Sequence, residues 1–326
     1  MYATGGIAFH YAIENSSDTR SVAATVTANY AQATLDGLRT ATTYSVWAVA
    51  TTADGSTYAS ETATFTTPQP TATPALGKPW AELPAYDASV TEISHFITDA
   101  GRTSDGYAPR NYAMGYDKQK KAALWVAYPL HSFYTKGNSS ERQYSADPSL
   151  GKTEQMVDGV SAPYNRGHQL PNADRRVSNM ANKQISYYSN MTPQNSSFNG
   201  GAWEKLESSV RNNICSDTLY VVTGCHFDSG YTTTTDKGGY KCPVPTQYYK
   251  VLLRTKDGAT GKRVADCPAS ELQCIGFWYE HTTSGSQTAA SCAASVADIE
   301  RKVGFTFFEN VPDAPKTIYS TSDWNL

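Results

Sequence analysis

The sequence has little charge, and neither sign dominates. Charged residues make up 17% of the 326 residues, with 27 lysines and arginines against 30 aspartates and glutamates and a formal net charge of -3. A strongly basic tail for binding nucleic acid is therefore absent, so a site for a polyanion has to be local. Runs of about 18 apolar residues are also absent, which excludes a membrane-spanning helix. Met1 is followed by YATGG, without the charged and apolar regions of a signal peptide, so we expect any leader to have been removed.

Cysteine pairs at zinc-binding spacing are missing as well. An even number of cysteines without such spacing favours disulfides in an oxidising compartment, although reduced thiols in a cytosolic enzyme are an alternative. Low charge with abundant Tyr, Thr, Ser and Gly also favours a secreted, periplasmic or cell-surface protein. Among the pairings that six cysteines allow, we expect Cys225 with Cys242, which flank a Gly- and Thr-rich loop. The six cysteines are Cys215, Cys225, Cys242, Cys267, Cys274 and Cys292.

Residues 1–67 are typical of a small all-β domain. The stretches GIAFHYAI, VAATVTANY, TTYSVWAVATT and ASETATFTT are rich in β-branched and aromatic residues, and Gly, Asn and Asp separate them. The last 34 residues of this part resemble the last three strands of a fibronectin type III domain, through Leu38 before a turn, Tyr44 opening a strand and Gly55 in a hairpin. An immunoglobulin-like sandwich of this type needs about seven strands and ~100 residues. We therefore expect a partial sandwich that lacks its first strands and leaves an edge exposed.

A proline-rich segment separates this part from a larger domain. TPQPTATPALGKPWAELPAY holds five prolines in twenty residues, which predicts an extended linker over residues 68–85. In residues 86–326 we expect buried strands at KAALWVAYPL, DTLYVVTG, QYYKVLLRT and QCIGFWYEH. Helical spacing appears in GGAWEKLESSVRNN and in SVADIERKVG, where Ser295 is a suitable N-cap and Gly304 a suitable end. This mixture of strands and helices indicates an α+β domain.

The segment YNRGHQLPNADR, from Tyr164 to Arg175, carries a histidine that is a candidate for catalysis. Gly167 allows the chain to turn sharply where a β-carbon would clash, and Pro171 stops a regular strand ladder. We therefore expect His168 at the end of a strand. Most single histidines are structural or merely exposed, so this segment alone does not identify a site.

A second polar segment follows downstream. YYSNMTPQNSSFNGGAWEKLE supplies Asn190, Asn199 and Glu207, and a helix is expected to begin near Gly200. Asn199 then lies at the position of an N-cap, which is the most frequent role of asparagine there. On an α-helix, Asn199 and Glu207 are separated by about 80° around the axis and ~12 Å along it. The two side chains can line one cleft, but a water has to mediate if both serve one ion.

Together these segments resemble the DNA/RNA non-specific endonucleases of the ββα-metal type, the group of Serratia nuclease and endonuclease G. The family pattern of Asp-Arg-Gly-His with Pro-x-Ala-Asp-Arg, then Asn-x-Thr-Pro-Gln and Asn-x-Gly-x-Trp-x-x-x-Glu, stands here as NRGHQLPNADR, NMTPQ and NGGAWEKLE. Motifs in this order and at the family's spacing are a strong signal, and the match covers most of residues 107–312. The resemblance implies a ββα-metal nuclease domain, with a central antiparallel sheet flanked by helices.

The resemblance also implies roles for the matched residues. His168 matches the general base that takes a proton from the attacking water. Asn199 matches the single residue that holds one Mg²⁺, with Mn²⁺ as a second option, while water and phosphate complete the shell. Glu207 would accept hydrogen bonds from the waters of that shell. Asn190 matches the asparagine that helps position His168 and the substrate.

Two arginines and one departure from the family pattern complete the expected site. Arg142, in SSERQYSADP, matches an arginine that grips the phosphate, because guanidinium fits its oxygens bidentately. Arg166 would support it. Asn165 stands where the family has an aspartate, so a negative charge near the metal is lost, although the amide oxygen still accepts a hydrogen bond.

The resemblance predicts a Mg²⁺-dependent, sugar-non-specific endonuclease that hydrolyses phosphodiester bonds of DNA and RNA. Contacts to phosphate carry no base information, which suits a non-specific enzyme. The alternative is a catalytically weakened nuclease fold that acts as a surface binding module through its β-sandwich, and Asn165 favours it most. A zinc or HNH-like site with His168, His226 or His281 lacks ligand pairs at the required spacing. The sequence leaves open the partner of the N-terminal domain and whether the chain forms a homodimer.

Overall fold

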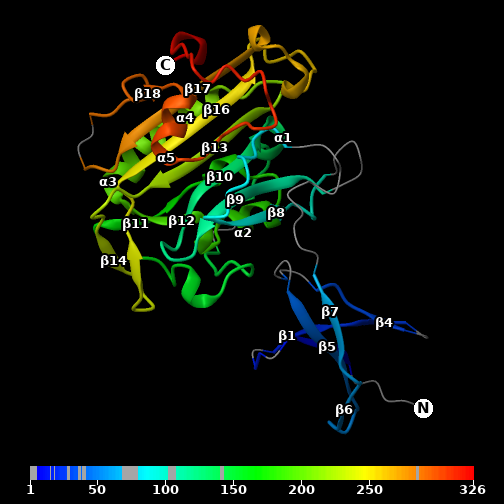
Figure 1. Cartoon of the computed structure of the whole chain (residues 1–326). Coiled ribbons are helices and arrows are strands. Elements are labelled where there is room, and N and C mark those ends of the chain that lie inside the picture. Colours follow the sequence, from blue (N-terminus) through cyan, green and yellow to red (C-terminus); the bar gives the residue numbers. More distant parts are fainter. Residues whose placement is uncertain are drawn as a thin grey trace. The chain divides into compact units, whose positions relative to one another are not determined.

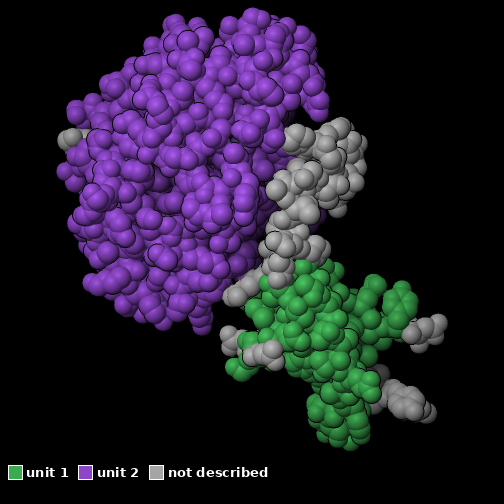
Figure 2. All heavy atoms as spheres, in the orientation of Figure 1, with its two compact units in different colours: residues 1–77 green, residues 78–326 purple. Residues whose placement is uncertain are grey.

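The computed structural model divides the chain into two compact units, Met1–Gly77 and Lys78–Leu326 (Figures 1 and 2). The structure describes residues 6–14, 16–17, 19–27, 30–35, 38, 42–67, 80–101, 108–139, 143–283 and 286–326. Residues 68–79, most of the expected linker, lie outside the described residues. Among the described residues, no helix combines the length and the apolar character needed to cross a membrane.

Antiparallel strands make up the described elements of the N-terminal unit. One sheet has the order β2-β1-β5-β6, with β7 also paired to β5, and a separate ribbon joins β3 to β4. The expected hairpin glycine, Gly55, has a φ of +86° and donates its N–H to the Thr52 carbonyl at 2.9 Å, so it turns the chain from β5 into β6. The strands agree with the expected all-β character, while the likeness to a fibronectin type III domain stays a prediction. The strands are β1 Ile7–Ile13, β2 Arg20–Ala23, β3 Thr25–Val26, β4 Ala31–Gln32, β5 Thr43–Thr51, β6 Thr57–Ala59 and β7 Ala63–Thr66.

The larger unit is built on a seven-stranded antiparallel sheet of order β18-β17-β16-β13-β10-β9-β8, which runs from orange to cyan in Figure 1. The four strands expected from apolar runs are β10, β13, β16 and β17, so the central antiparallel sheet is confirmed. Two-stranded pairs, β11 with β12 and β14 with β15, lie outside this sheet. The strands are β8 Thr91–Phe96, β9 Arg110–Asp117, β10 Ala122–Leu130, β11 Tyr164–His168, β12 Met191–Asn195, β13 Leu219–His226, β14 Thr233–Thr235, β15 Lys241–Pro243, β16 Gln247–Thr255, β17 Leu272–Glu280 and β18 Ala293–Ala294.

Helices cover both faces of this sheet. One apolar core gathers α2 and α4 against the sheet, and a second gathers α5 and the segment around Phe307 against the other face. The expected helix ends are confirmed for α5, since Ser295 caps it by accepting from the Asp298 N–H at 3.0 Å and Gly304 closes it with a φ of +80°. The α-helices are α1 Ser132–Thr135, α2 Asn179–Ile185, α3 Ser196–Phe198, α4 Glu204–Asn212 and α5 Val296–Val303, and a π-helical turn spans Asn199–Trp203.

The end of the expected linker belongs to the larger unit. Ala81 and Leu83 are buried in the second core, so residues 80–85 were wrongly assigned to an extended linker. The prolines indicated a linker, but the apolar side chains between them pack into the core instead. The guanidinium of Arg110 lies 3.8 Å from the ring centroid of Trp80 and pairs with the buried carboxylate of Glu82, which anchors this segment.

The expected disulfides do not form in this structure. All six cysteines are free thiols, so both the general expectation and the proposed Cys225–Cys242 pair are wrong here. Cys225 lies in the central sheet, where its thiol donates to the Ala123 carbonyl at 3.4 Å. Cys242 lies in the small β14–β15 ribbon, with its thiol 3.6 Å from an Asp236 carboxylate oxygen. Burial raises the pKa of each of these two thiols to about 12, which keeps them protonated.

Candidate active site

His168 ends strand β11, as expected, and pairs across the hairpin with Met191 of β12. The role expected for Gly167 is wrong, because this residue lies inside the strand and its φ is not positive. A β-carbon at Gly167 would instead come within 2.3 Å of the Gln194 side-chain oxygen on the facing strand. Glycine is therefore needed for the close approach of two strands, and this approach fixes the strand end that carries His168.

Asn190 holds the backbone just after His168. Its amide group is fully buried, accepts from the Leu170 N–H at 3.0 Å, and donates to the carbonyls of Leu170 at 3.0 Å and Ile185 at 2.8 Å. The Gln169 N–H also donates to the Asn190 carbonyl at 2.9 Å. Because every donor and acceptor is directed at backbone, Asn190 can position His168, but it does not line the cleft described below.

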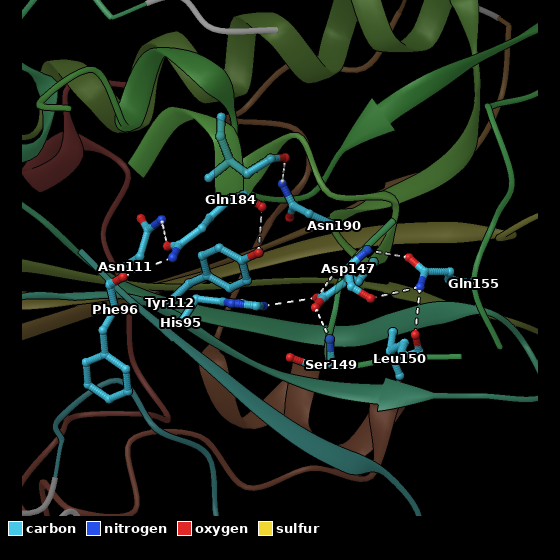
Figure 3. Close-up of polar contacts among 12 residues, drawn as sticks. His95, Phe96, Asn111, Tyr112, Asp147, Ser149, Leu150, Gln155, Gln184 and Asn190 are labelled. Atoms are coloured by element: carbon cyan, nitrogen blue, oxygen red, sulfur yellow. Dashed lines mark hydrogen bonds and ion pairs between the residues drawn. The ribbon is translucent and has the colours of Figure 1, made fainter. Parts of the chain in front are cut away.

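Behind this turn, a buried carboxylate joins several distant segments (Figure 3). Asp147 lies 3.0 Å from His95 Nε2 of β8 and accepts from the Ser189 hydroxyl at 2.5 Å and from the Ser149 N–H at 2.8 Å. Burial alone would raise the pKa of Asp147, but His95, Ser189 and the Ser149 amide outweigh it, so the pKa is lowered. The network links β8, at one edge of the sheet, to the turn that contains Asn190, and so helps to fix the position of that turn.

Asn199 is not the N-cap of the helical run. The capping residue is Asn195, whose side chain accepts from the Ser197 N–H at 3.1 Å at the start of α3. Asn199 already has helical backbone angles, φ -58° and ψ -51°, and begins the π-helical turn that leads into α4. The helix therefore starts earlier than expected. Its π-turn also changes the angular spacing to Glu207 that a regular α-helix would give, and such turns are frequent at functional sites.

A group of buried charges surrounds Glu207 on α4. Burial raises the pKa of the Glu207 carboxyl, and the Lys250 ammonium offsets part of that effect. Lys250 is fully buried, donates to the Thr223 hydroxyl at 3.0 Å, and lies 4.5 Å from the ring centroid of Trp203. Burial lowers the pKa of Lys250, while Glu207 raises it again. Glu207 is partly exposed where it lines the cleft, whereas Lys250 is buried in the protein interior. Part of the Glu207 side chain therefore stays accessible to solvent.

One open cleft of about 550 Å³ brings most of the expected residues together. The hairpin strand β11 supplies His168, and the helical run from α3 to α4 supplies Asn199 and Glu207. Arg142 lies outside the described residues, so its position stays a prediction. The expected residues that line the cleft are Asn165, Arg166, His168, Asn199 and Glu207.

The cleft also contains residues that sequence reasoning missed. Arg211 follows Glu207 by four residues, so the helical spacing predicts that the two side chains lie on the same face of α4. Arg211 also pairs with the buried Asp174 at 3.1 Å. Tyr144, Asp158 and Lys237 come from loops and a ribbon that only the fold brings together, and the sequence gives no local signal for them. The lining residues that sequence reasoning missed include Tyr144, Asp158, Glu204, Arg211 and Lys237.

The donor set suits a hard divalent cation. Asn199 offers an amide oxygen, and Glu204 and Glu207 offer carboxylates to the same open cleft. Among the described residues, no group of three His, Cys, Asp or Glu side chains could hold a metal ion. A site with few protein ligands that leaves room for water is what Mg²⁺ accepts most readily.

The sequence pattern of the DNA/RNA non-specific endonuclease family matches residues 92–314, which is more than half of the chain. The chain belongs to this family. Members of this endonuclease family are phosphodiester hydrolases, and the matched region contains the whole described cleft. The expected family is therefore confirmed.

Individual relatives agree with this membership. The zebrafish (Danio rerio) mitochondrial nuclease EXOG is 30% identical over 227 residues, which cover 65% of this chain and 62% of the relative. A nuclease of Serratia marcescens is 28% identical over 214 residues, which cover 62% of this chain and 74% of the relative. A solved structure of an EndoG/EndoGI complex aligns with a TM-score of 0.50 at 23% identity, over 61% of this chain and 84% of that chain, and shows a shared fold. The chain thus spans less than two thirds of the length of the zebrafish relative.

Proposed function

We propose that this protein is a Mg²⁺-dependent, sugar-non-specific endonuclease that hydrolyses phosphodiester bonds of DNA and RNA. The observation that carries the proposal is that His168 from β11 lines one cleft together with Asn199 and Glu207 from the α3–α4 run. The cleft is open and polar, and the cations Arg166, Arg211 and Lys237 are among its lining residues, so a flexible polyanion can enter it.

His168 is the proposed general base. It stands at a strand end fixed by Gly167 and by the Asn190 contacts to the following residues, so its ring can be held against an attacking water. Removal of a general base typically costs about 10² to 10⁴ in rate. Arg211, which also lines the cleft, would hold oxygens of the cleaved phosphate together with Arg142, and Arg166 would support them.

Asn199 is the proposed protein ligand of the metal, with Mn²⁺ as a second ion that the same oxygen donors accept. When bound, the cation would supply positive charge to the phosphate and so stabilise the charge that develops during cleavage. Glu207 would offer a hydrogen-bond acceptor to this part of the cleft, and the charge of the buried Lys250 lowers the pKa of that carboxyl against the effect of burial.

The indifference to sugar and base follows from contacts to phosphate alone. We further propose a fibronectin type III-like character for the N-terminal unit, whose partner is open, and a secreted, periplasmic or cell-surface location. The zebrafish relative, in contrast, is named as a mitochondrial protein. A homodimer likewise stays a prediction. The weakened binding module is not favoured, because the described cleft retains His168, Asn199 and Glu207.

The test is cleavage of supercoiled plasmid DNA and of single-stranded RNA, each with Mg²⁺ and with EDTA. We expect both substrates to be cut with Mg²⁺ and neither with EDTA, and His168→Ala to be inactive but folded. His226→Ala is the matched control, because His226 is also partly buried but does not line the cleft. Its Nε2 atom lies 3.5 Å from an Asp228 carboxylate oxygen. Cleavage by His168→Ala at the wild-type rate, or undiminished cleavage in EDTA, would contradict the assignment.

A further inference from the structure

At one wall of the cleft, Asp158 lies between two cations. Its carboxylate oxygens are 4.0 Å from Arg166 Nη1 and 3.9 Å from Lys237 Nζ. The Tyr188 hydroxyl donates to the same carboxylate at 3.3 Å. The Asp158 side chain is 62% exposed, so this acid stands in solvent at the surface that a substrate has to cross.

The two cations are held in place by separate parts of the fold. The Arg166 guanidinium lies 3.8 Å from the ring centroid of Tyr144, which supports it from one face. A β-carbon at Gly159 would come within 2.7 Å of Arg166 Cδ, so a glycine beside Asp158 makes room for the arginine stem. Lys237 lies between β14 and β15, and its backbone N–H donates to the Gly159 carbonyl at 2.9 Å.

This arrangement leaves the carboxylate easy to displace. The two ion pairs are long and exposed, and pairs of this kind contribute little to stability. A carboxylate and a phosphodiester each carry one negative charge and present two oxygens, so both can bridge the same two cations. With Asp158 in place the trio carries one net positive charge, and without it the two cations carry two.

We propose that Arg166 and Lys237 form a second phosphate-binding subsite for the nucleic-acid backbone, and that Asp158 occupies it in the free protein. The proposal rests on the proposed nuclease function. Arg166 is two residues from His168 on β11, so the subsite would hold a phosphate next to the one that is cleaved. Asp158 then lowers the affinity for long polyanions and makes product release easier.

The binding test uses a fluorescently labelled single-stranded oligonucleotide in EDTA, so that cleavage does not interfere, over a series of salt concentrations. Asp158→Asn should tighten binding by about two- to fivefold, and Lys237→Gln should weaken it by a similar factor. Lys237→Gln should also reduce the slope of log affinity against log salt by about 0.7, the value for one lost contact to a single strand. Matched controls are Asp313→Asn and Lys241→Gln, both at exposed positions away from the cleft.

The double variant Asp158→Asn/Lys237→Gln decides the mechanism. If Asp158 masks Lys237, the gain in oligonucleotide affinity from Asp158→Asn should be clearly smaller when Lys237 is already replaced by glutamine. An effect of Asp158→Asn equal to that of Asp313→Asn, or undiminished in the double variant, would overturn the subsite. Plasmid cleavage by the wild type with Mg²⁺, measured in parallel, separates the two proposals. If the wild type cleaves plasmid but the variants bind the oligonucleotide unchanged, only the subsite proposal is wrong. If the variants show the expected binding changes but the wild type does not cleave, only the proposed nuclease activity is wrong.

Discussion

The Nε2 atom of His281 accepts a hydrogen bond from the backbone N–H of Asn195 at 2.7 Å. The other ring nitrogen lies 2.7 Å from the Pro245 carbonyl oxygen and donates to it. These two bonds require a neutral ring, because one nitrogen has to accept while the other donates. Burial lowers the pKa of His281, in agreement with that state. Since Asn195 caps the helical run that contains Asn199, His281 fixes the position of the proposed metal ligand from outside the cleft.

Replacement of His281 by alanine should destabilise the protein and slow cleavage. The change leaves the Asn195 N–H and the Pro245 carbonyl without their partner, and an unsatisfied buried group costs about 1–3 kcal/mol. We expect a loss of about 2 kcal/mol in the free energy of unfolding, measured by urea denaturation. His281→Gln, whose side-chain oxygen can accept from Asn195, is the control and should recover part of the loss. Equal stability of His281→Ala and the wild type would contradict this role.

The same bond gives the stability a pH dependence. The pKa of His281 is lower in the folded protein than its ordinary value of 6.5, so the contribution is complete above about pH 6.5 and is lost as the pH falls through the folded-state pKa. Wild-type stability should therefore decline below pH 6.5 more steeply than that of His281→Gln. Denaturation midpoints of both proteins across this range test it, and parallel curves would exclude His281 as the source.

Asn199→Ala should cost activity and metal binding without loss of the N-cap. Because the cap is Asn195, the matched control Asn195→Ala should lose about 1 kcal/mol of stability instead. We expect Asn199→Ala to melt close to the wild-type temperature and to need much more Mg²⁺ for cleavage. Calorimetric titration of Mg²⁺ in the absence of substrate gives a readout that does not depend on turnover. Unchanged Mg²⁺ binding in Asn199→Ala would remove this residue from the metal site.

Asp217 should make the larger unit sensitive to acid. Its carboxylate is 8% exposed and accepts from the Thr255 hydroxyl at 2.5 Å, from Thr260 and from the Gly261 N–H at 2.9 Å. Burial alone would raise its pKa, but these hydrogen bonds lower it to about 2. The folded-state pKa is thus depressed, so the stabilisation is present above about pH 4 and is lost as the pH falls towards 2.

Asp217→Asn should accordingly lower the free energy of unfolding by about 1–2 kcal/mol at neutral pH. The difference between wild type and variant should then shrink as the pH falls from about 4 to about 2. Urea denaturation at a series of pH values measures this difference, with the exposed Asp313→Asn as the control. A difference that stays constant through this range would show that the Asp217 charge does not stabilise the fold.

Elements with a strong local pattern could be predicted from the sequence. The helical spacing of Trp203, Leu206 and Val210 predicts one buried face, and all three side chains are buried in the core. Continuous apolar runs likewise predict the central strands. Strand β9, which lies between β8 and β10 in the sheet, was missed, because its buried residues include Gly115, whose missing β-carbon leaves room for the Trp125 indole. Nothing near Gly115 in the sequence indicates that contact.

The site was predictable to the extent that it follows the family motifs. His168, Asn199 and Glu207 share one cleft, whereas Asn190 turns its amide group to the backbone instead. The other features of the site depend on contacts between segments that are far apart in the sequence, which local patterns do not predict. The burial of Lys250 behind Glu207 depends on the pairing of β13 with β16, and no local pattern marks a lysine in an apolar strand as a partner of a helix residue.

Asn165 is the position at which this chain departs from its family, and Asn165→Asp is the last prediction. The Asn165 side-chain oxygen accepts from the Ser196 hydroxyl at 3.1 Å, at the start of the helical run that leads to Asn199. Alternation along β11 directs Asn165 and His168 to opposite faces of the strand. A carboxylate at position 165 should therefore act mainly on the Asn199 side of the cleft, where a negative charge favours a cation.

We expect Asn165→Asp to lower the Mg²⁺ concentration for half-maximal cleavage severalfold and to tighten Mg²⁺ binding measured by calorimetry. The acid limb of the pH–rate profile should move less, and to higher pH, because a nearby negative charge favours the protonated form of His168, which cannot act as a base. Ser196→Ala is the control for the hydrogen bond, since it removes the Asn165 partner without adding charge. If the acid limb moves while Mg²⁺ binding stays the same, residue 165 acts on His168 and not on the metal. If neither moves, the charge at this position does not reach the site, and the loss of the family aspartate has no catalytic consequence.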